Sequence, residues 1–237
     1  MIFRKLIRAI HRCRLQPGLS AFLLAFLLAF LSAWSQSSLA GKITAAVKDQ
    51  AGRPVEDAVI SALPLDARKI PPPQKTQDEV DQIDKDFVPH VKVVYVNTLV
   101  HFPNKDNIRH HVYSFSVAKK FELPLYAGTQ SAPVLFDKAG VVVLGCNIHD
   151  WMLGYVYVTD TPYFGKTKND GIAGIDNLPA GDYLLRVWQP RMEDSEESTG
   201  RKVTLNTDEG KALEWQLTLK PDKRISRTSS SRGGAYR

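Results

Sequence analysis

The 237-residue chain contains only two cysteines, Cys13 and Cys146. Cys13 belongs to an N-terminal segment that we expect to be removed, which leaves Cys146 without a partner for a disulfide bond. Exported proteins usually pair their cysteines. An unpaired cysteine is a buried inert residue, a reactive thiol or a metal ligand, so the neighbours of Cys146 must decide among these roles.

Motifs of several enzyme and cofactor classes are also absent. The sequence has no G-x-S-x-G, H-E-x-x-H or C-x-x-C-H pattern, which argues against a serine hydrolase, a zinc protease and a c-type haem protein. Only Met152 and Met192 follow the N-terminal segment. This scarcity disfavours a flexible, methionine-rich arm of the kind that hands metal ions from one protein to another.

No apolar run is long enough for a typical membrane span. The longest almost wholly apolar stretch, Ala21–Trp34, has 14 residues, whereas a spanning helix needs about 20. Five basic residues and no acidic residue precede this run within residues 1–20, and Ser38-Leu39-Ala40 provides small residues for cleavage before Gly41. This pattern predicts a cleavable signal peptide at residues 1–40 and export to the periplasm; an uncleaved anchor is the alternative.

The positive charge of the chain is concentrated at its two ends. The formal net charge is +6, but residues 1–40 carry +5 and residues 221–237 carry +4, which leaves −3 for residues 41–220. The basic balance therefore does not indicate nucleic-acid binding. Residues 221–237 have little apolar content, and we expect a disordered basic tail there.

Short β-prone runs separated by turn residues predict an all-β fold, either a sandwich or a barrel. Prolines at positions 64 and 71–73 interrupt the chain, and the acidic stretch 77–86 is expected to form a loop or a short helix. The expected strands are residues 42–47, 58–63, 91–96, 99–102, 112–117, 134–136, 141–144, 153–159, 184–188 and 212–219.

Of the three roles open to an unpaired cysteine, the neighbours of Cys146 favour that of a metal ligand. Cys146, His149 and Met152 occur at C-x-x-H-x-x-M spacing at the end of an apolar run. A thiolate, imidazoles and a weak thioether ligand are typical of a blue-copper site, provided that a second histidine comes from elsewhere in the chain. Zinc is the less favoured metal, because methionine is an unusual zinc ligand. The second histidine is expected to be His110 or His111.

A family resemblance rests on these residues and their surroundings. The segments Val100–Asn104 and Phe136–Gly140, together with His110 and the C-x-x-H-x-x-M motif, resemble those of cupredoxins such as amicyanin and plastocyanin. Residues 110–116, 145–152 and 160–164 are similar to exported plastocyanin-like proteins labelled methylamine utilisation proteins. The resemblance covers roughly residues 86–165. It implies a Greek-key β-sandwich that holds one mononuclear type 1 copper ion.

The resemblance implies His110, Cys146, His149 and Met152 as the copper ligands. In the family pattern the first histidine lies six residues after an asparagine, and counting from Asn104 selects His110. The next position is often an asparagine that braces the cysteine loop. Here it is His111, so His111 stays the alternative ligand; because a strand alternates faces, only one of the two should reach the metal.

Four other residues near these positions need a role. His90 and His101 are expected to be ordinary strand histidines. Asp150 and Trp151 are expected to be a solvated and a packed side chain. The alternative is that Asp150 tunes His149 while Trp151 shields the copper.

The segments on either side of the copper motif resemble a second family. Val47–Val59, Thr167–Gly171 and Leu178–Tyr183 look like parts of a carboxypeptidase regulatory-like β-sandwich. We therefore expect a discontinuous sandwich, built from residues 41–68 and 160–220, with a cupredoxin domain of residues 69–159 inserted into it. The alternative is that residues 41–63 supply the first cupredoxin strands.

Together, these features predict a periplasmic type 1 copper protein that carries single electrons between redox protein partners and is not an enzyme. The identity of the partner is unknown. Neither nucleic-acid binding nor stable membrane insertion after cleavage is expected. The alternatives are a copper-handling protein and a structural envelope module without an electron-transfer role.

Overall fold

The computed structural model describes residues 40–128 and 132–222. The predicted signal peptide, except Ala40, and the predicted tail, except Pro221 and Asp222, lie outside these residues. Besides strands, the described part contains two short 3-10 helices, η1 (Ala67–Lys69) and η2 (Glu196–Thr199). The predicted all-β class is therefore confirmed. None of the described helices has the length and apolar character that crossing a membrane requires.

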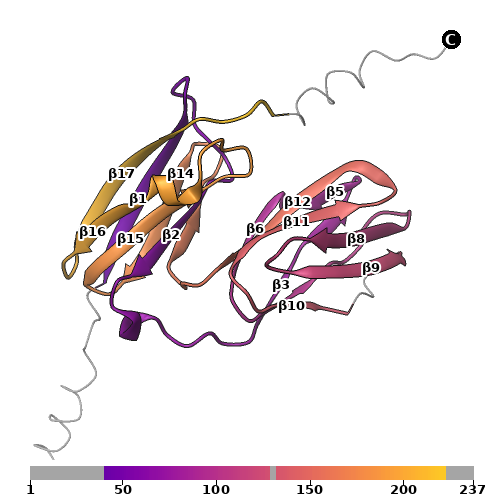
Figure 1. Ribbon diagram of the computed structural model, residues 1–237, viewed down its shortest axis with the longest axis horizontal. Coiled ribbons are helices and arrows are strands. Elements are labelled where there is room, and N and C mark those ends of the chain that lie inside the picture. Colours follow the sequence, from indigo (N-terminus) through magenta and orange to yellow (C-terminus); the bar gives the residue numbers. More distant parts are fainter. Residues whose placement is uncertain (1–39, 129–131, 223–237) are drawn as a thin grey trace, which may run out of the picture. The chain divides into compact units, whose positions relative to one another are not determined.

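The strands fall into two groups, each of which forms a β-sandwich (Figure 1). Strands β3 to β12 form what we call the central sandwich, and β1, β2 and β13 to β17 form the flanking sandwich. The strands are β1 (Gly41–Asp49), β2 (Val59–Pro64), β3 (Thr76–Glu79), β4 (Asp81–Ile83), β5 (Asp86–Val88), β6 (Val91–Tyr95), β7 (Thr98–His101), β8 (His110–Phe115), β9 (Lys120–Tyr126), β10 (Val134–Phe136), β11 (Gly140–Cys146), β12 (His149–Thr159), β13 (Phe164–Lys166), β14 (Ile172–Leu178), β15 (Gly181–Trp188), β16 (Arg201–Leu205) and β17 (Gly210–Leu217).

The central sandwich packs a five-stranded sheet against a three-stranded sheet. The strand orders are β6-β12-β11-β8-β9 and β10-β7-β3, and β4 and β5 form a separate hairpin. Val100 and Phe136 from the smaller sheet share one buried cluster with Val112, Leu144 and Val156 from the larger sheet. Because these buried side chains come from both sheets and belong to one cluster, the two sheets enclose a single apolar core.

The flanking sandwich is assembled from both ends of the described chain. One sheet has the order β14-β1-β17 and the other the order β13-β2-β15-β16; Figure 1 shows β1 in indigo beside the orange β14 and the yellow β17. Ile43, Ile175 and Trp215 from the first sheet and Ile60 and Leu185 from the second belong to one core. Strands distant in the sequence therefore complete one hydrophobic core.

A discontinuous sandwich of the expected kind predicts that residues 43–47 pair with, or lie beside, residues 183–188. It does not pair with them, since β1 pairs with β14 and β17, whereas β15 pairs with β2 and β16. Val47 and Val187 nevertheless belong to the same core, so β1 and β15 face each other across the sandwich. The limits of the predicted domains stay a prediction.

Several expected elements were wrong in kind or length. Residues 77–86 form neither a loop nor a helix; most of them lie in β3, β4 and the start of β5. β3 is an edge strand, where charged side chains protect the open edge. β9, β13, β14 and β16 were missed. β9 is also an edge strand, and it tolerates Pro124 for that reason.

Candidate metal centre

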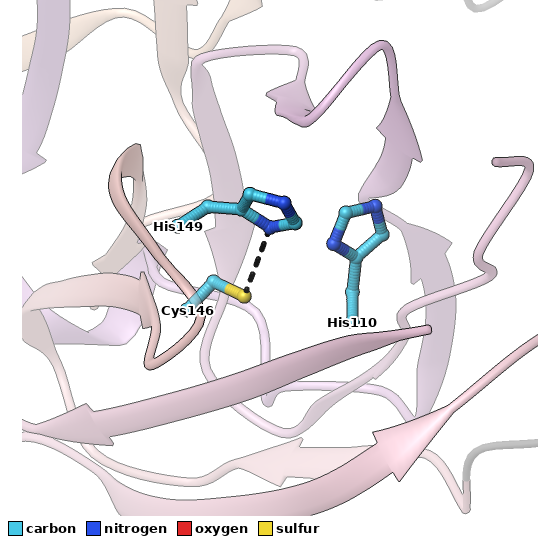
Figure 2. Close-up of side chains that lie close together, drawn as sticks. All are labelled: His110, Cys146 and His149. Carbon is cyan, nitrogen blue, oxygen red and sulfur yellow. Dashed lines mark hydrogen bonds between the residues drawn. The ribbon is translucent and has the colours of Figure 1, made fainter. Parts of the chain in front are cut away.

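Two of the predicted ligands lie at the two ends of one tight turn. Cys146 is the last residue of β11, His149 is the first residue of β12, and only Asn147 and Ile148 separate them. The two residues oppose each other in the antiparallel pairing, after a register shift that follows Gly145. The Sγ of Cys146 lies 3.7 Å from the Nδ1 of His149, as the dashed line in Figure 2 marks. The two side chains therefore converge without a longer loop.

His110 approaches from a different strand. It is the first residue of β8 and is fully buried. Figure 2 shows its ring facing Cys146 and His149, with one ring nitrogen turned toward them. One potential ligand atom from each of the three residues lies within 4.8 Å of the others, and the centroids of the two imidazole rings are 4.9 Å apart. Three metal-binding side chains thus meet at one point of the central sandwich.

The two nitrogens of His110 have different surroundings. The Nε2 lies 2.7 Å from the Oδ2 of Asp106, whereas the Nδ1 is buried and has no hydrogen-bond partner among the described residues. A buried polar atom without a partner costs free energy. A metal ion between His110, Cys146 and His149 would provide the missing partner, and a thiolate with two imidazoles is a suitable donor set for copper or zinc.

His111 belongs to a different environment. Its Nε2 lies 2.9 Å from the Oε1 of Glu122 on the neighbouring strand β9, and its ring centroid is 5.4 Å from that of Tyr113. It is not part of the cluster of three metal-binding side chains. Of the two histidines between which the sequence left a choice, the structure therefore brings His110 to Cys146 and His149.

Met152, the fourth predicted ligand, is 1% exposed. It lies in β12, and its side chain belongs to the same core cluster as that of Cys146. A thioether in this position is protected from water by the core of the central sandwich. Its part as a weak copper ligand stays a prediction.

Asp106 is a residue of this site that the sequence did not single out. Besides facing His110, its carboxylate accepts hydrogen bonds from the backbone N–H groups of Asp84 (2.7 Å) and Lys85 (2.9 Å). These two residues form the turn of the β4–β5 hairpin. The backbone N–H of Asp106 in turn donates to the Oδ1 of Asn104. The only available signal was an acid four residues before a histidine, which is common in loops.

Electrostatics favour an ionised Asp106 and a neutral His149. Burial raises the pKa of Asp106, but hydrogen bonds from the backbone of Lys85, from His110 and from the backbone of Asp84 outweigh it, so that the pKa is lowered. Burial lowers the pKa of His149; His110 and Lys85 lower it further, and Asp106 opposes them. A neutral imidazole and an ionised carboxylate nearby suit the binding of a cation.

Part of this chain is similar to several solved protein structures. A Cu-containing nitrite reductase from Thermus scotoductus is 26% identical and has a TM-score of 0.33; the match covers 37% of this chain and only 23% of the reductase, so the chain spans about a quarter of that protein. A purple cupredoxin from Nitrosopumilus maritimus is 24% identical, with a TM-score of 0.31, over 35% of this chain and 99% of its own. An oxidised amicyanin variant is 21% identical, with a TM-score of 0.32, over 44% of this chain and 100% of its own.

Comparisons at the level of families and sequences found nothing. No protein-family profile matches the chain, and no curated protein matches its sequence.

The half-buried His149 lies where the centre meets solvent. It lines an open hollow together with the hairpin turn Asp84–Lys85 and residues 106–108. Trp151 is 46% exposed, and its ring centroid lies 5.2 Å from that of His149. Trp151 therefore covers part of one side of the His149 ring and is not a fully packed side chain, while Asp150 is exposed as expected.

His90 and His101 lie outside the cluster of metal-binding side chains. The Nδ1 of His90 is 3.1 Å from the backbone oxygen of Leu153, and His101 ends β7. Neither contributes to the three-residue cluster. His101 agrees with an ordinary strand histidine, whereas His90 lies between β5 and β6 and not in a strand.

Proposed function

We propose that this chain is a periplasmic type 1 copper protein that carries single electrons. The observation that carries the proposal concerns His110, whose ring faces Cys146 and His149. Its buried Nδ1 has no hydrogen-bond partner in the described part of the chain. These side chains fit a mononuclear copper ion, with Met152 as the weak fourth ligand. Copper bound there would supply a Cu(II)/Cu(I) couple that takes up and releases one electron.

The protein would contribute a rigid set of donors. The three strong ligands stand at the ends of β8, β11 and β12, which are neighbouring strands of one sheet. Cys146 and Met152 are anchored in the core of the central sandwich. Because a close-packed core resists displacement, the donor positions should change little between the two oxidation states. A small rearrangement favours fast electron transfer.

The proposed compartment follows from the N-terminal sequence. Cleavage before Gly41 would leave a chain whose first residue begins β1, so every described strand of the flanking sandwich would remain. An oxidising compartment also suits the unpaired Cys146, because a buried thiolate that binds copper is not free to form disulfides. The partner would be another redox protein, with His149, which lines the surface hollow, as the route for the electron.

The flanking sandwich is proposed to be a discontinuous domain of the carboxypeptidase regulatory-like type, into which the copper domain is inserted. Its support is the pairing of β2 with β13 and β15 and of β1 with β14 and β17. No cluster of metal-binding side chains is found in the described part of this sandwich. A role in stability or in protein contact is the corresponding proposal.

Electrochemistry of residues 41–237 loaded with one equivalent of Cu(II) tests the electron-carrier function. We expect one reversible one-electron wave that persists through repeated cycles. A chain that binds copper tightly but gives no reversible wave would contradict electron transfer and would support the copper-handling alternative. A Cys146→Ser variant serves as the control for copper that binds elsewhere.

A further inference from the structure

The carboxylate of Asp106 has an unusual position, because it joins a metal-binding side chain to a distant hairpin. Its Oδ1 accepts the N–H of Asp84 at 2.7 Å, and its Oδ2 accepts the N–H of Lys85 at 2.9 Å. The same Oδ2 lies 2.7 Å from the Nε2 of His110. Two backbone donors therefore hold the carboxylate in place against the ring of His110.

The loop around Asp106 is fixed as well. Asn104 accepts the backbone N–H of Asp106 and donates its own side-chain amide to the backbone oxygens of Ile108 and Tyr126. Asn104 is 3% exposed. Because Asn104 is buried and the carboxylate of Asp106 is held by two backbone N–H groups, the distance from Asp106 to His110 does not depend on a mobile surface side chain.

The chemistry of the pair decides where the proton of His110 resides. An ionised carboxylate only accepts hydrogen bonds, and a neutral imidazole carries its proton on one nitrogen alone. Because the Nε2 of His110 faces the carboxylate of Asp106, which only accepts, Nε2 has to be the nitrogen that carries the proton. The Nδ1 then keeps its lone pair on the ring edge that faces Cys146 and His149, where it is buried and no described residue is its hydrogen-bond partner.

We propose that Asp106 is a positioning residue that holds the proton of His110 on Nε2 and thereby keeps Nδ1 ready to bind the metal. The proposal rests on the proposed copper site and deepens it. Asp106 acts through His110 and does not itself touch the metal. Asparagine in its place would offer an amide N–H₂ as well as an oxygen, so the two backbone donors and the ring could no longer all be satisfied.

The first test needs neither copper nor a variant. Long-range ¹H–¹⁵N NMR spectra of the metal-free chain, residues 41–237, at neutral pH should show His110 protonated on Nε2. A His110 ring protonated on Nδ1 would overturn the proposal. Because this measurement is made on the metal-free wild-type chain, it stands even if Asp106 variants fail to fold.

The second test compares Asp106→Asn with two matched controls. We expect Asp106→Asn to lose the Nε2-protonated form and to bind Cu(II) about 10- to 100-fold more weakly, as is usual when the hydrogen-bond partner of a metal-binding histidine is removed. Asp81→Asn removes a nearby carboxylate that pairs with Lys105, and Glu122→Gln changes the partner of His111. Both controls should keep the tautomer of His110 and the copper affinity.

The outcomes separate this inference from the proposed function. An Asp106→Asn variant that folds and retains both the wild-type tautomer and the wild-type copper affinity would overturn the role of Asp106. A wild-type chain that shows the expected tautomer but forms no copper–thiolate band would instead contradict the copper site, while the role of Asp106 in placing the proton would be supported.

Discussion

His110 and His111 are consecutive residues of β8 whose side chains meet different partners. His110 reaches Asp106 and the cluster with Cys146, whereas His111 reaches Glu122. Both are buried. Because successive side chains of a strand point to opposite faces, substitutions of the two residues should have separable effects on metal binding and on stability.

The first prediction concerns this pair. His110→Ala should abolish the intense visible band of a copper thiolate, because the ion loses one of three strong ligands. His111→Ala should leave the band in place and lower the free energy of unfolding by about 0.5–3 kcal/mol, as is usual for a buried residue. Absorption spectra after addition of Cu(II) and urea unfolding measure the two effects. The reverse pattern would assign the ligand to His111.

The second prediction concerns Met152. Met152→Leu conserves the volume of a buried side chain, so it should change the free energy of unfolding by less than about 1.5 kcal/mol. It should raise the reduction potential, because losing a weak thioether donor destabilises Cu(II) more than Cu(I). Voltammetry of the two copper-loaded chains provides the comparison. An unchanged potential would show that Met152 only fills the core.

The approach of His149 to Cys146 could be predicted from the sequence, because the two residues are close together in the chain. Cys146, His149 and Met152 lie within seven positions, and their spacing alone indicates the chemistry. The choice of His110 needed an offset from Asn104, and only strand geometry separates it from His111. Asp106 was missed because its role depends on the turn at Asp84–Lys85, which is brought to it by folding.

At the scale of elements, strand centres were easier to predict than strand ends. The apolar runs at residues 91–96 and 134–136 became β6 and β10 almost unchanged. β12 instead begins at His149, four residues before the expected start, because the antiparallel pairing with β11 continues to the turn. Charged edge strands such as β3 lack the apolar alternation that marks an interior strand.

The turn between β14 and β15 gives a pH-dependent prediction. Tyr183 is fully buried, and its hydroxyl donates a 2.5 Å hydrogen bond to the backbone oxygen of Pro179. Burial, with a smaller contribution from Tyr163, raises its pKa from 10.0 to about 12. The folded state thus holds the proton of Tyr183 more tightly than the unfolded state does. The contribution of this hydroxyl to the free energy of unfolding is therefore complete below pH 10 and is lost as the pH rises toward 12.

Tyr183→Phe should therefore show an effect that depends on pH. At pH 7 the variant should be less stable by about 0.5–1.5 kcal/mol, because the hydrogen bond to Pro179 is lost. The difference in the free energy of unfolding between the two chains should narrow between pH 10 and 12. There the ionisation of Tyr183 lowers the stability of the wild type by up to about 1.4 kcal/mol per pH unit. Urea unfolding at several pH values measures the difference. A stability difference that stays the same at every pH would contradict the raised pKa of Tyr183.

At the scale of the whole described chain, the path of the backbone suggests an insertion. Ala62 in β2 donates its N–H to the backbone oxygen of Tyr163 at 2.8 Å, and its own oxygen accepts from the Oγ1 of Thr161 at 2.8 Å. The chain thus leaves the flanking sandwich after β2 and returns beside it. Insertion at such a point leaves the ends close together, so a short connection could replace the inserted part.

The fourth prediction tests this arrangement. A chain of residues 41–222 in which a short Gly-Ser linker replaces residues 69–159 should unfold cooperatively and bind no copper through a thiolate, because it keeps the strands of the flanking sandwich. Far-UV circular dichroism during urea unfolding is the measurement. The same chain without residues 41–49 should not fold, since β1 lies between β14 and β17. A shortened chain without a cooperative transition would contradict the discontinuous domain.

The central claim is that His110, Cys146 and His149 hold one copper ion through a thiolate. Its most direct test is the visible absorption spectrum of residues 41–237 during titration with Cu(II). We predict an intense thiolate-to-copper charge-transfer band that saturates at one copper per chain and is absent from Cys146→Ser. No band in the wild-type chain, or a band that persists in Cys146→Ser, would contradict the account.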